Sequence, residues 1–360
     1  MTKPTMYSYI YEQPVKLAQI LENYPQQFKN LPDLTQTKEW LILGTGSSIN
    51  AAKSAKIYIE KQANVRIEIE EPFNFQHYEK SNPQLDLILG ISQSGQSTST
   101  IDAIKKLRAQ NTAPSIAVTS ITGSEITAET DVTLDIGCGR ERVGYVTLGF
   151  SATVLTLMLF GLHLGVKKGL ITFEEEAAEL ADFKEIIQTI ERSLAQSEHF
   201  FEMYRDEFKT APRFTTVAYG PAVGTAKEME TKFSETVRVP SQGIELEAFM
   251  HGPYLEVNPE HRIFFLEVPS PNLEKEQLLK AYEQKCTDFI YTITTEKTTA
   301  ERTLSLDISV DEFKAPLILM IPLQILAWLI AKEKNIDLTK RIYTDFAQQV
   351  KSKTQVQDYV

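Results

Sequence analysis

The feature that most constrains the fold is an internal repeat. One common offset along the chain aligns the following pairs of residues: Gly46 with Gly220, Ala52 with Ala226, Glu71 with Glu245, Phe75 with Phe249, and His77 with His251. In each half, short apolar runs alternate with segments whose apolar residues recur at helical spacing. Strands that alternate with helices are typical of a parallel sheet with helices on both faces. The simplest account is a duplicated α/β domain, in which each copy is a three-layer, flavodoxin-like sandwich.

Apolar runs and glycine turns locate the elements of the two halves. Helices are expected at Tyr7–Tyr24, Asn50–Lys61, Ala222–Val239 and Pro316–Lys332, and a further helix is expected to end at Leu107. Strands are expected at Trp40–Gly44, Leu85–Ile91, Ser115–Ser120, Val132–Ile136, Phe214–Tyr219, Arg262–Val268, Thr287–Thr295 and Thr303–Ile308. These elements predict four parts: a first domain with its N-terminal helix (1–170), a helical connector (171–210), a second domain (211–345) and a C-terminal tail (346–360).

Charge and cysteine content exclude several classes of protein. The 360 residues carry a net charge of −11 without a lysine- and arginine-rich stripe, so no nucleic-acid partner is expected. Cys138 and Cys286 are too few for a disulfide framework or a cysteine-based zinc site, and they fit a reducing cytoplasm.

The N-terminus lacks the apolar core of a signal peptide. Two long apolar stretches, 143–166 and 315–331, are interpreted as buried core helices and not as membrane spans.

Two polar loops follow predicted strands of the first half, where open parallel sheets bind ligands. The loop residues expected to bind a phosphate group are Gly46, Ser47, Ser48, Ser92, Gln93, Ser94 and Ser97. Hydroxyls and backbone N–H groups at a helix N-terminus suit a phosphate dianion, and Gly95 lets the backbone approach it. The alternative is that these serines only cap helices and form turns. Neither loop has the sequence of a Walker P-loop or of a dinucleotide-binding turn.

The sequence Ile-Ser-Gln-Ser-Gly, at 91–95, resembles the phosphate loop of the SIS (sugar isomerase) domain family. Glu12-Gln13-Pro14 and the segment Lys232–Pro253 resemble the isomerase part of glucosamine-6-phosphate synthase. The resemblance runs over essentially the whole chain from Glu12, and it is most specific in these segments. It implies two tandem SIS domains.

Glu228, Lys232 and Glu235 are spaced so that they share one face of a helix, and His251 follows in a His-Gly-Pro turn. Isomerising a sugar phosphate needs a group that assists ring opening, which a histidine provides, and a base that moves a proton between C1 and C2, which a carboxylate provides. The alternative is an exposed helix face with ordinary ion pairs.

The resemblance implies roles for these residues. Glu235 would be the C1/C2 base, His251 the ring-opening residue, and Glu228 and Lys232 supporting polar groups. In the family the histidine reaches the site from a neighbouring subunit, which implies a homodimer or larger assembly with a shared active site. The same residues resemble those of deglycases that cleave phosphorylated Amadori compounds. A tail lysine that holds the open-chain carbonyl in the synthase would be Lys351, with Lys353 as second choice.

The chain departs from the synthase in several places. Gln96 stands where the phosphate loop of the synthase is acidic, and Val146 and Leu148 replace a serine and a lysine of its second sugar-contacting loop. The pocket is therefore expected to accept a different group. The chain does not begin with a nucleophilic cysteine, and no glutaminase domain precedes the isomerase-like part, so no glutaminase activity is expected.

The leading hypothesis is a cytoplasmic enzyme that acts on an amino-substituted hexose 6-phosphate, without metal or organic cofactor. It would cleave the sugar–amine bond, as a deglycase or deaminase, or interconvert aldose and ketose. A plain isomerase with no amine involved needs the same residues. The alternative is a non-catalytic phosphosugar-binding regulator; the lack of a helix-turn-helix segment and of a basic patch argues against it.

Overall fold

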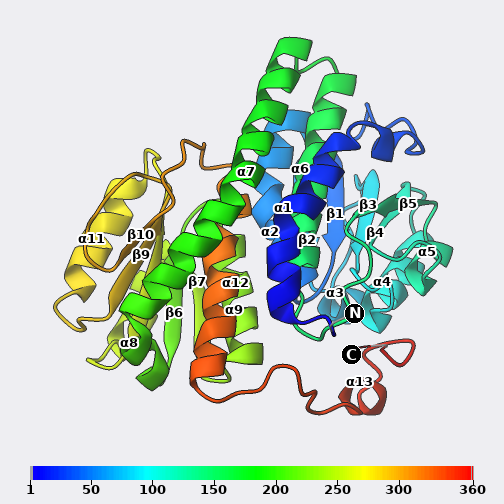
Figure 1. The fold of residues 1–360 in the computed structure, drawn as a ribbon. Helices are drawn as coiled ribbons and strands as arrows, with labels where there is room; N and C mark the ends of the chain where they lie inside the picture. The colour runs from blue at the N-terminus through cyan, green and yellow to red at the C-terminus, as the bar shows by residue number, and fades with distance from the viewer. Residues whose placement is uncertain (1–2, 358, 360) are drawn as a thin grey trace. The chain divides into compact units, whose positions relative to one another are not determined.

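The computed structural model describes residues 3–357 and 359, and the chain divides into two compact units (Figure 1). The first unit consists mainly of Val15–Ala181 and the C-terminal segment that begins at Arg341. The second consists mainly of Asp182–Lys340, with Thr5–Pro14 from the N-terminal helix. Two helices, α1 (Met6–Glu22) and α7 (Phe173–Met203), have residues in both units.

The first unit is built on a five-stranded parallel sheet in the order β2-β1-β3-β4-β5. Its strands are β1 (Glu39–Leu43), β2 (Arg66–Glu70), β3 (Leu87–Ile91), β4 (Ser115–Thr119) and β5 (Val132–Asp135). Its helices are η1 (Gln26–Phe28), α2 (Ser47–Ala63), α3 (Pro72–Tyr78), α4 (Thr98–Arg108), α5 (Glu125–Ala128) and α6 (Leu148–Lys167), and the C-terminal segment adds α13 (Phe346–Gln349).

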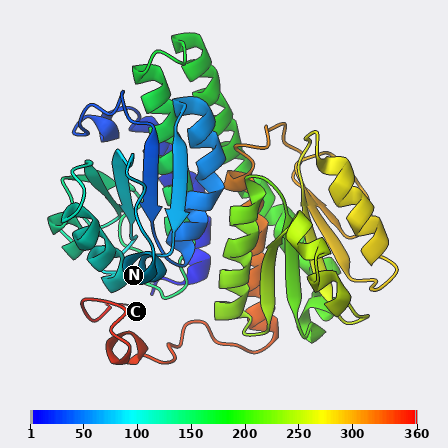
Figure 2. The same cartoon turned by 180° about the vertical axis from the view of Figure 1, so that it is seen from behind.

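The second unit has the same construction, with the sheet order β7-β6-β8-β9-β10. Its strands are β6 (Phe214–Ala218), β7 (Ser241–Glu245), β8 (Arg262–Glu267), β9 (Ile290–Thr294) and β10 (Thr303–Ser305). Its helices are α8 (Arg205–Thr210), α9 (Ala222–Thr236), α10 (Leu246–Met250), η2 (Pro253–Glu256), α11 (Leu273–Glu283) and α12 (Pro316–Glu333). Figure 2 shows both sheets from behind.

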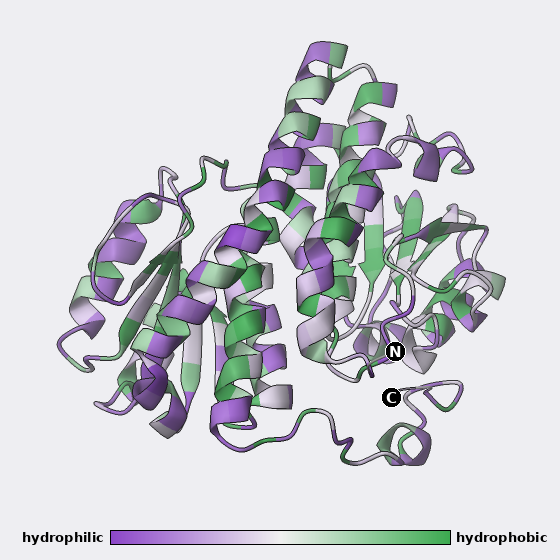
Figure 3. Ribbon diagram, in the orientation of Figure 1, coloured by the Kyte–Doolittle hydropathy of each residue, from purple (hydrophilic) through white to green (hydrophobic). Residues whose placement is uncertain are grey.

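The most apolar helix of each unit lies in its core. By length and composition, α6 and α12 are apolar enough to cross a membrane, but 89% and 78% of their most apolar windows are buried inside the fold. Figure 3 shows both helices as largely hydrophobic ribbons. Within the first unit, α6 packs against α2, and Phe160 of α6 stacks on Trp40 of β1. This burial agrees with their interpretation as core helices.

In the second unit, α9 lies so close to edge strand β7 that only glycine fits at the contact. A Cβ atom at Gly243 would lie 1.9 Å from the backbone oxygen of Ala226. The amide of Gly243 also donates to Glu230 Oε2 of α9, at 2.8 Å. The missing side chain therefore fixes how this helix packs on its sheet.

The prediction of two parallel α/β units flanked by helices is confirmed, and strands β1, β3, β4, β6, β8 and β9 lie at the apolar runs. Strands β2 and β7 were not predicted; they are edge strands with the sequences RIEIE and SQGIE. A strand that is buried on just one face needs few apolar residues, so these two strands lack the continuous apolar run of a central strand.

Candidate functional site

The two predicted phosphate loops follow β1 and β3, which are neighbours in the first sheet. The chain continues from β1 to β2 on one side and from β3 to β4 on the other, so the loops lie at the topological switch point, where open α/β sheets bind ligands. Gly46 has a φ of +58° at the start of α2, and the Ser47 and Ser48 side chains beside it are half-buried. The structure thus brings both loops to one edge of the sheet.

The conformation of the loop after β3 depends on Gly95. Its φ is +67°, its amide donates to the Ser92 oxygen at 2.9 Å, and its own oxygen accepts from the Ile126 amide at 3.0 Å. A Cβ atom at this position would lie 1.8 Å from Ser124 Oγ. Only glycine permits this close approach between the loop and the segment after β4.

Three polar side-chain atoms around this loop are buried without a hydrogen-bond partner in the described part of the chain: Gln93 Nε2, Thr98 Oγ1 and Ser124 Oγ. A buried polar atom without a partner costs about 1–3 kcal/mol, so such atoms are rare in folded proteins. Three of them lie around one loop, at the N-terminus of helix α4, so a polar ligand at this loop would find partners for hydrogen bonds. Ser92 and Ser97 are linked to each other, since the Ser97 amide donates to Ser92 Oγ at 3.4 Å.

Glu141, which was not among the predicted site residues, lies beside this loop. Its buried carboxylate accepts hydrogen bonds from the amides of Thr147 and Gly149, both at 2.9 Å, and so occupies the N-terminus of α6. A Cβ atom at Gly149 would lie 3.0 Å from Gln93 Cγ, so this helix start packs directly against the loop. A carboxylate at a helix N-terminus is stabilised by the helix dipole, and it leaves this terminus less open to an anion.

The C-terminal segment lies on the same loop, within the same unit. Lys353 forms an antiparallel bridge with Ser97. On either side of it, the Thr98 amide donates to the Ser352 oxygen at 3.2 Å and the Thr354 amide donates to the Gln96 oxygen at 3.1 Å. Figure 1 shows this red segment beside the unit that contains α4.

The two candidate tail lysines differ in their surroundings. Lys353 is half-buried, its Nζ donates to Ser94 Oγ at 3.1 Å, and burial lowers its pKa. Lys351 is exposed, with a φ of +53°. The structure therefore places the second choice, Lys353, at the loop, and leaves Lys351 in solvent.

The predicted acid–base residues lie in the second unit, on α9. Lys232 Nζ is 2.7 Å from Glu235 Oε2 and 3.6 Å from Glu228 Oε1. The side chains of Glu228 and Lys232 are buried, whereas that of Glu235 is 36% exposed. The structure thus brings the three residues together, and their burial is unlike that of an exposed helix face with ion pairs. Glu235 is held by a buried ammonium group and still reaches solvent.

His251 ends the short helix α10 and points into solvent. Its side chain is 74% exposed, and its Nε2 lies 3.2 Å from Glu247 Oε1. The amide of Ala248 donates to Glu245 Oε2 at 2.8 Å, which caps α10 at its other end. Gly252 follows with a φ of +129°, which allows the sharp turn before Pro253.

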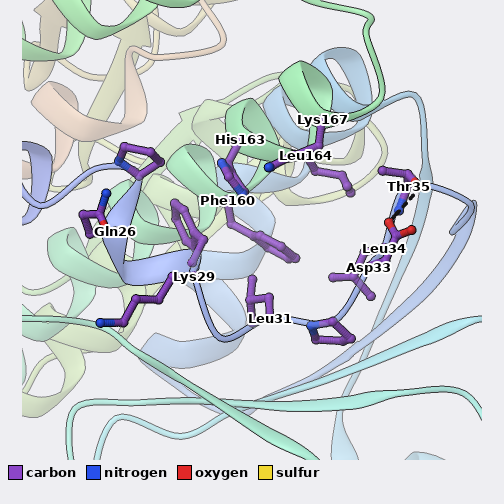
Figure 4. Close-up of a pocket in the computed structure, with 13 residues that line it drawn as sticks. Gln26, Lys29, Leu31, Asp33, Leu34, Thr35, Phe160, His163, Leu164 and Lys167 are labelled. Atoms are coloured by element: carbon purple, nitrogen blue, oxygen red, sulfur yellow. Dashed lines mark hydrogen bonds between the residues drawn. The ribbon is translucent and has the colours of Figure 1, made fainter.

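A pocket of about 390 Å³ in the first unit lies away from the predicted phosphate loops (Figure 4). The His163 ring stacks on Phe28 with centroids 5.1 Å apart, and Lys29 and Lys167 also line the pocket. Helix α6 begins beside the phosphate loop and ends at this pocket, about 21 Å along the helix from Gly149 to His163. None of the predicted site residues lines it.

Comparison with known families finds a match in the first unit. Residues 33–164 match the family model of the SIS domain. This part of the chain is similar to an SIS domain. The matched region runs from before β1 into the last turn of α6, so it includes both predicted phosphate loops.

Relatives extend the similarity beyond this region. The chain is 27% identical over 342 residues to the glutamine–fructose-6-phosphate aminotransferase of Zymomonas mobilis, covering 91% of this chain and 56% of that protein. The chain thus spans about half the length of the curated relatives it matches. The resemblance to the SIS family and to this synthase is confirmed.

Solved structures support the same fold over both units. The C-terminal domain of glucosamine-fructose-6-phosphate aminotransferase from Francisella tularensis matches with a TM-score of 0.83 and 23% identity, over 92% of this chain and 96% of that one. Glucosamine-6-phosphate deaminase from Thermotoga maritima matches with a TM-score of 0.76 and 21% identity, over 94% and 97%. The fold is therefore that of tandem SIS domains, as expected.

Proposed function

We propose that this protein is an enzyme that acts on an amino-substituted hexose 6-phosphate by acid–base catalysis, with Glu235 as the base. The observation that carries the proposal is the ion pair of Glu235, a carboxylate that reaches solvent, with the buried Lys232. A base must be fixed in position and accessible to its substrate, and this carboxylate meets both requirements. The names of the relatives, an aminotransferase of fructose 6-phosphate and a glucosamine-6-phosphate deaminase, support an amino sugar phosphate as substrate.

In the proposed reaction the loop after β3 binds the phosphate group and His251 assists ring opening by moving a proton at the ring oxygen. With a ketose that carries an amine on C1, Glu235 takes a proton from C1, the C2 oxygen gains a proton, and an enaminol forms. Glu235 then returns its proton to C2 while the amine nitrogen loses its own proton. The product is an imine at C1, which one water molecule hydrolyses to the aldose phosphate and the free amine. With an oxygen in place of the nitrogen, the same proton transfer interconverts ketose and aldose. One base therefore serves both reactions, and the group on C1 decides the product.

The exposed position of His251 supports a further part of this proposal. A histidine whose side chain is 74% exposed is accessible to another molecule, so we place it in the active site of a neighbouring subunit within a homodimer or larger assembly. Mixing inactive His251→Ala and Glu235→Gln proteins would then restore some activity. A mixed assembly contains a site in which the intact Glu235 of one subunit meets the intact His251 of the other. No recovery after subunit exchange would contradict the shared site.

The decisive assay measures hexose 6-phosphate and free amine released from the 6-phosphates of fructose-lysine, glucose-lysine and fructose-asparagine, and ammonia from glucosamine 6-phosphate. Glu235→Gln is expected to lower kcat by about 10²- to 10⁴-fold, as removal of a general base does, while thermal stabilisation by the substrate persists. Turnover at the wild-type rate in this variant would show that Glu235 is not the base.

Glu230→Gln is a closely matched control. Glu230 lies on the same helix, is 37% exposed, and pairs with Lys227, three residues before it, at 3.0 Å. Its lysine partner is 37% exposed, however, and not buried. This variant is expected to keep the wild-type kcat. Wild-type protein that binds these phosphosugars without converting any of them would indicate a non-catalytic binding protein.

A further inference from the structure

Lys353, which is half-buried, differs from the buried lysines of the described residues. Lys232 pairs with Glu228 and Glu235, and Lys314 pairs with Asp182 and Asp311. Lys353 donates one hydrogen bond, to Ser94 Oγ, and no carboxylate of the described residues lies within ion-pair distance of it. Its positive charge is therefore held against the phosphate loop without a counter-charge from residues 3–357 and 359.

A buried ammonium group is costly unless an anion accompanies it. Burial lowers the pKa of Lys353, as expected for a cation removed from water without a partner. An ammonium group has three donors, and Ser94 accepts only one of them. The unpartnered Gln93 Nε2, Thr98 Oγ1 and Ser124 Oγ belong to the same loop region, so the missing partner is a group rich in acceptor oxygens and negative in charge.

We propose that Lys353 is a ligand of the substrate's phosphate group, and that the bound anion fastens the C-terminal segment to the loop. The inference rests on the proposed function, in which this loop takes a hexose 6-phosphate. It differs from the role implied for Lys351, since that lysine would contact the sugar carbonyl and not the phosphate. A lysine that approaches from a separate segment adds a full charge to a site otherwise made of hydroxyls, amides and a helix N-terminus.

The backbone pairing of the segment explains how binding and docking are coupled. Lys353 lies between two hydrogen bonds that join the segment to the loop, Thr98 N to Ser352 O and Thr354 N to Gln96 O. An anion that holds the ammonium group therefore holds these bonds too. Because coupling between two equilibria is reciprocal, the anion must strengthen docking by the same factor by which docking strengthens anion binding.

The test uses inorganic phosphate, which has no carbonyl and undergoes no turnover. Isothermal titration of the full-length chain measures its affinity for wild type, Lys353→Met, Lys353→Arg and Lys351→Met. Loss of one charge-assisted hydrogen bond is expected to weaken phosphate binding about 10- to 100-fold in Lys353→Met. Lys353→Arg keeps the charge and is expected to recover most of the affinity. Lys351→Met, two residues away on the same segment, is expected to bind phosphate like wild type.

Hydrogen exchange provides the second measurement. Phosphate is expected to slow exchange of the Thr98 and Thr354 amides in wild type and in Lys351→Met, and to leave them unchanged in Lys353→Met. Equal phosphate affinity in wild type and Lys353→Met would overturn this inference while leaving the proposed function intact, as would protection of these amides that does not depend on Lys353. A wild-type protein that binds neither phosphate nor a hexose 6-phosphate would overturn both.

Discussion

The two repeats have the same sheet connectivity but differ at the carboxyl ends of corresponding strands. The loop after β3 contains Gly95 at a positive φ and several hydroxyls, whereas the loop after β8 reads Val-Pro-Ser-Pro-Asn, at 268–272. Two prolines remove two backbone donors from this second loop. Its only hydroxyl, on Ser270, is already 2.7 Å from the Tyr219 hydroxyl. The second loop therefore lacks the donors that a phosphate needs.

The helices that follow the first strand of each repeat show the opposite difference, because here the candidate functional side chains lie in the second repeat and not in the first. The offset that aligns the repeats places Ser54, Tyr58 and Lys61 of α2 at the positions of Glu228, Lys232 and Glu235 of α9. Ser54 Oγ donates to the Asn50 oxygen of its own helix, at 3.0 Å. One repeat thus carries the proposed phosphate loop and the other the proposed catalytic carboxylate. The comparison teaches that duplication preserved the buried sheet and left the loops and helix faces at its edge to diverge.

The largest effect on stability is expected from the buried ion pairs of α9. Lys232→Met removes a cation whose neighbour Glu228 is fully buried, and breaking such a pair costs about 3–5 kcal/mol of the free energy of unfolding. Tyr58→Phe, at the equivalent position of the first repeat, removes one hydrogen bond from Tyr58 to Glu179 and is expected to cost about 0.5–1.5 kcal/mol. Urea unfolding of both variants measures the difference. Similar losses in the two variants would contradict the distinction between these helices.

A second difference between the repeats is a carboxyl group that is buried near the start of α11 and has no buried counterpart at the equivalent position of α4. Both oxygens of Glu276 lack a hydrogen-bond partner among the described residues, and burial, assisted by the nearby Glu267, raises the pKa of Glu276 to about 9. Below the usual pKa of 4.5 the group is protonated in both states. Between this value and about 9 the unfolded chain loses its proton while the folded chain keeps it, so the free energy of unfolding falls as the pH rises.

Glu276→Gln is expected to remove this decline, so that the variant gains stability over wild type by a few kcal/mol near pH 9 and little near pH 5. Urea unfolding at several pH values measures it. Asp102→Asn is the matched control, because Asp102 occupies the equivalent place on α4 and is only half-buried. A Glu276→Gln profile parallel to that of wild type would show that the carboxyl group is not held in its protonated form.

The smallest effect is expected from single loop hydroxyls. Ser94→Ala removes one ligand of the proposed phosphate site, and the loss of one hydrogen bond to a charged group weakens phosphate binding about tenfold. Ser270→Ala in the corresponding loop of the second repeat is expected to leave phosphate affinity unchanged. Titration with inorganic phosphate compares the two variants. An equal loss in both would show that the second loop also takes part in binding.

Much of the fold follows from the sequence because the central strands are continuous apolar runs that end at glycine or serine. The positions of Gly95 and of the loop serines were predictable for the same reason: they directly follow such a run. The burial of Glu228 and Lys232 was not predictable, because charged residues at helical spacing are far more often exposed. Their burial depends on packing within the second unit that no local pattern records.

The position of the tail lysine was also not predictable from the sequence. Successive residues of an extended segment point to opposite sides, and Lys351 and Lys353 differ by two residues, so their spacing alone would give them the same side. The positive φ of Lys351 breaks this alternation, and only Lys353 pairs with the loop. A backbone conformation that favours glycine, adopted here by a lysine, has no signal in the sequence. The contacts of Gly149 with Gln93 and of Gly95 with Ser124 likewise join residues far apart in the sequence, so no local pattern predicts them.

The glycine of edge strand β7 has a consequence for how a duplicated chain assembles. Two repeats with one connectivity risk exchanging equivalent strands while they fold, which is a common route to misassembly in repeat proteins. The residue of β2 that corresponds to Gly243 is Ile69. If β2 took the place of β7, the Ile69 side chain would collide with the backbone of α9, since even a Cβ atom there lies 1.9 Å from the Ala226 oxygen. A single missing side chain thus keeps this strand of each repeat from being interchangeable with its counterpart.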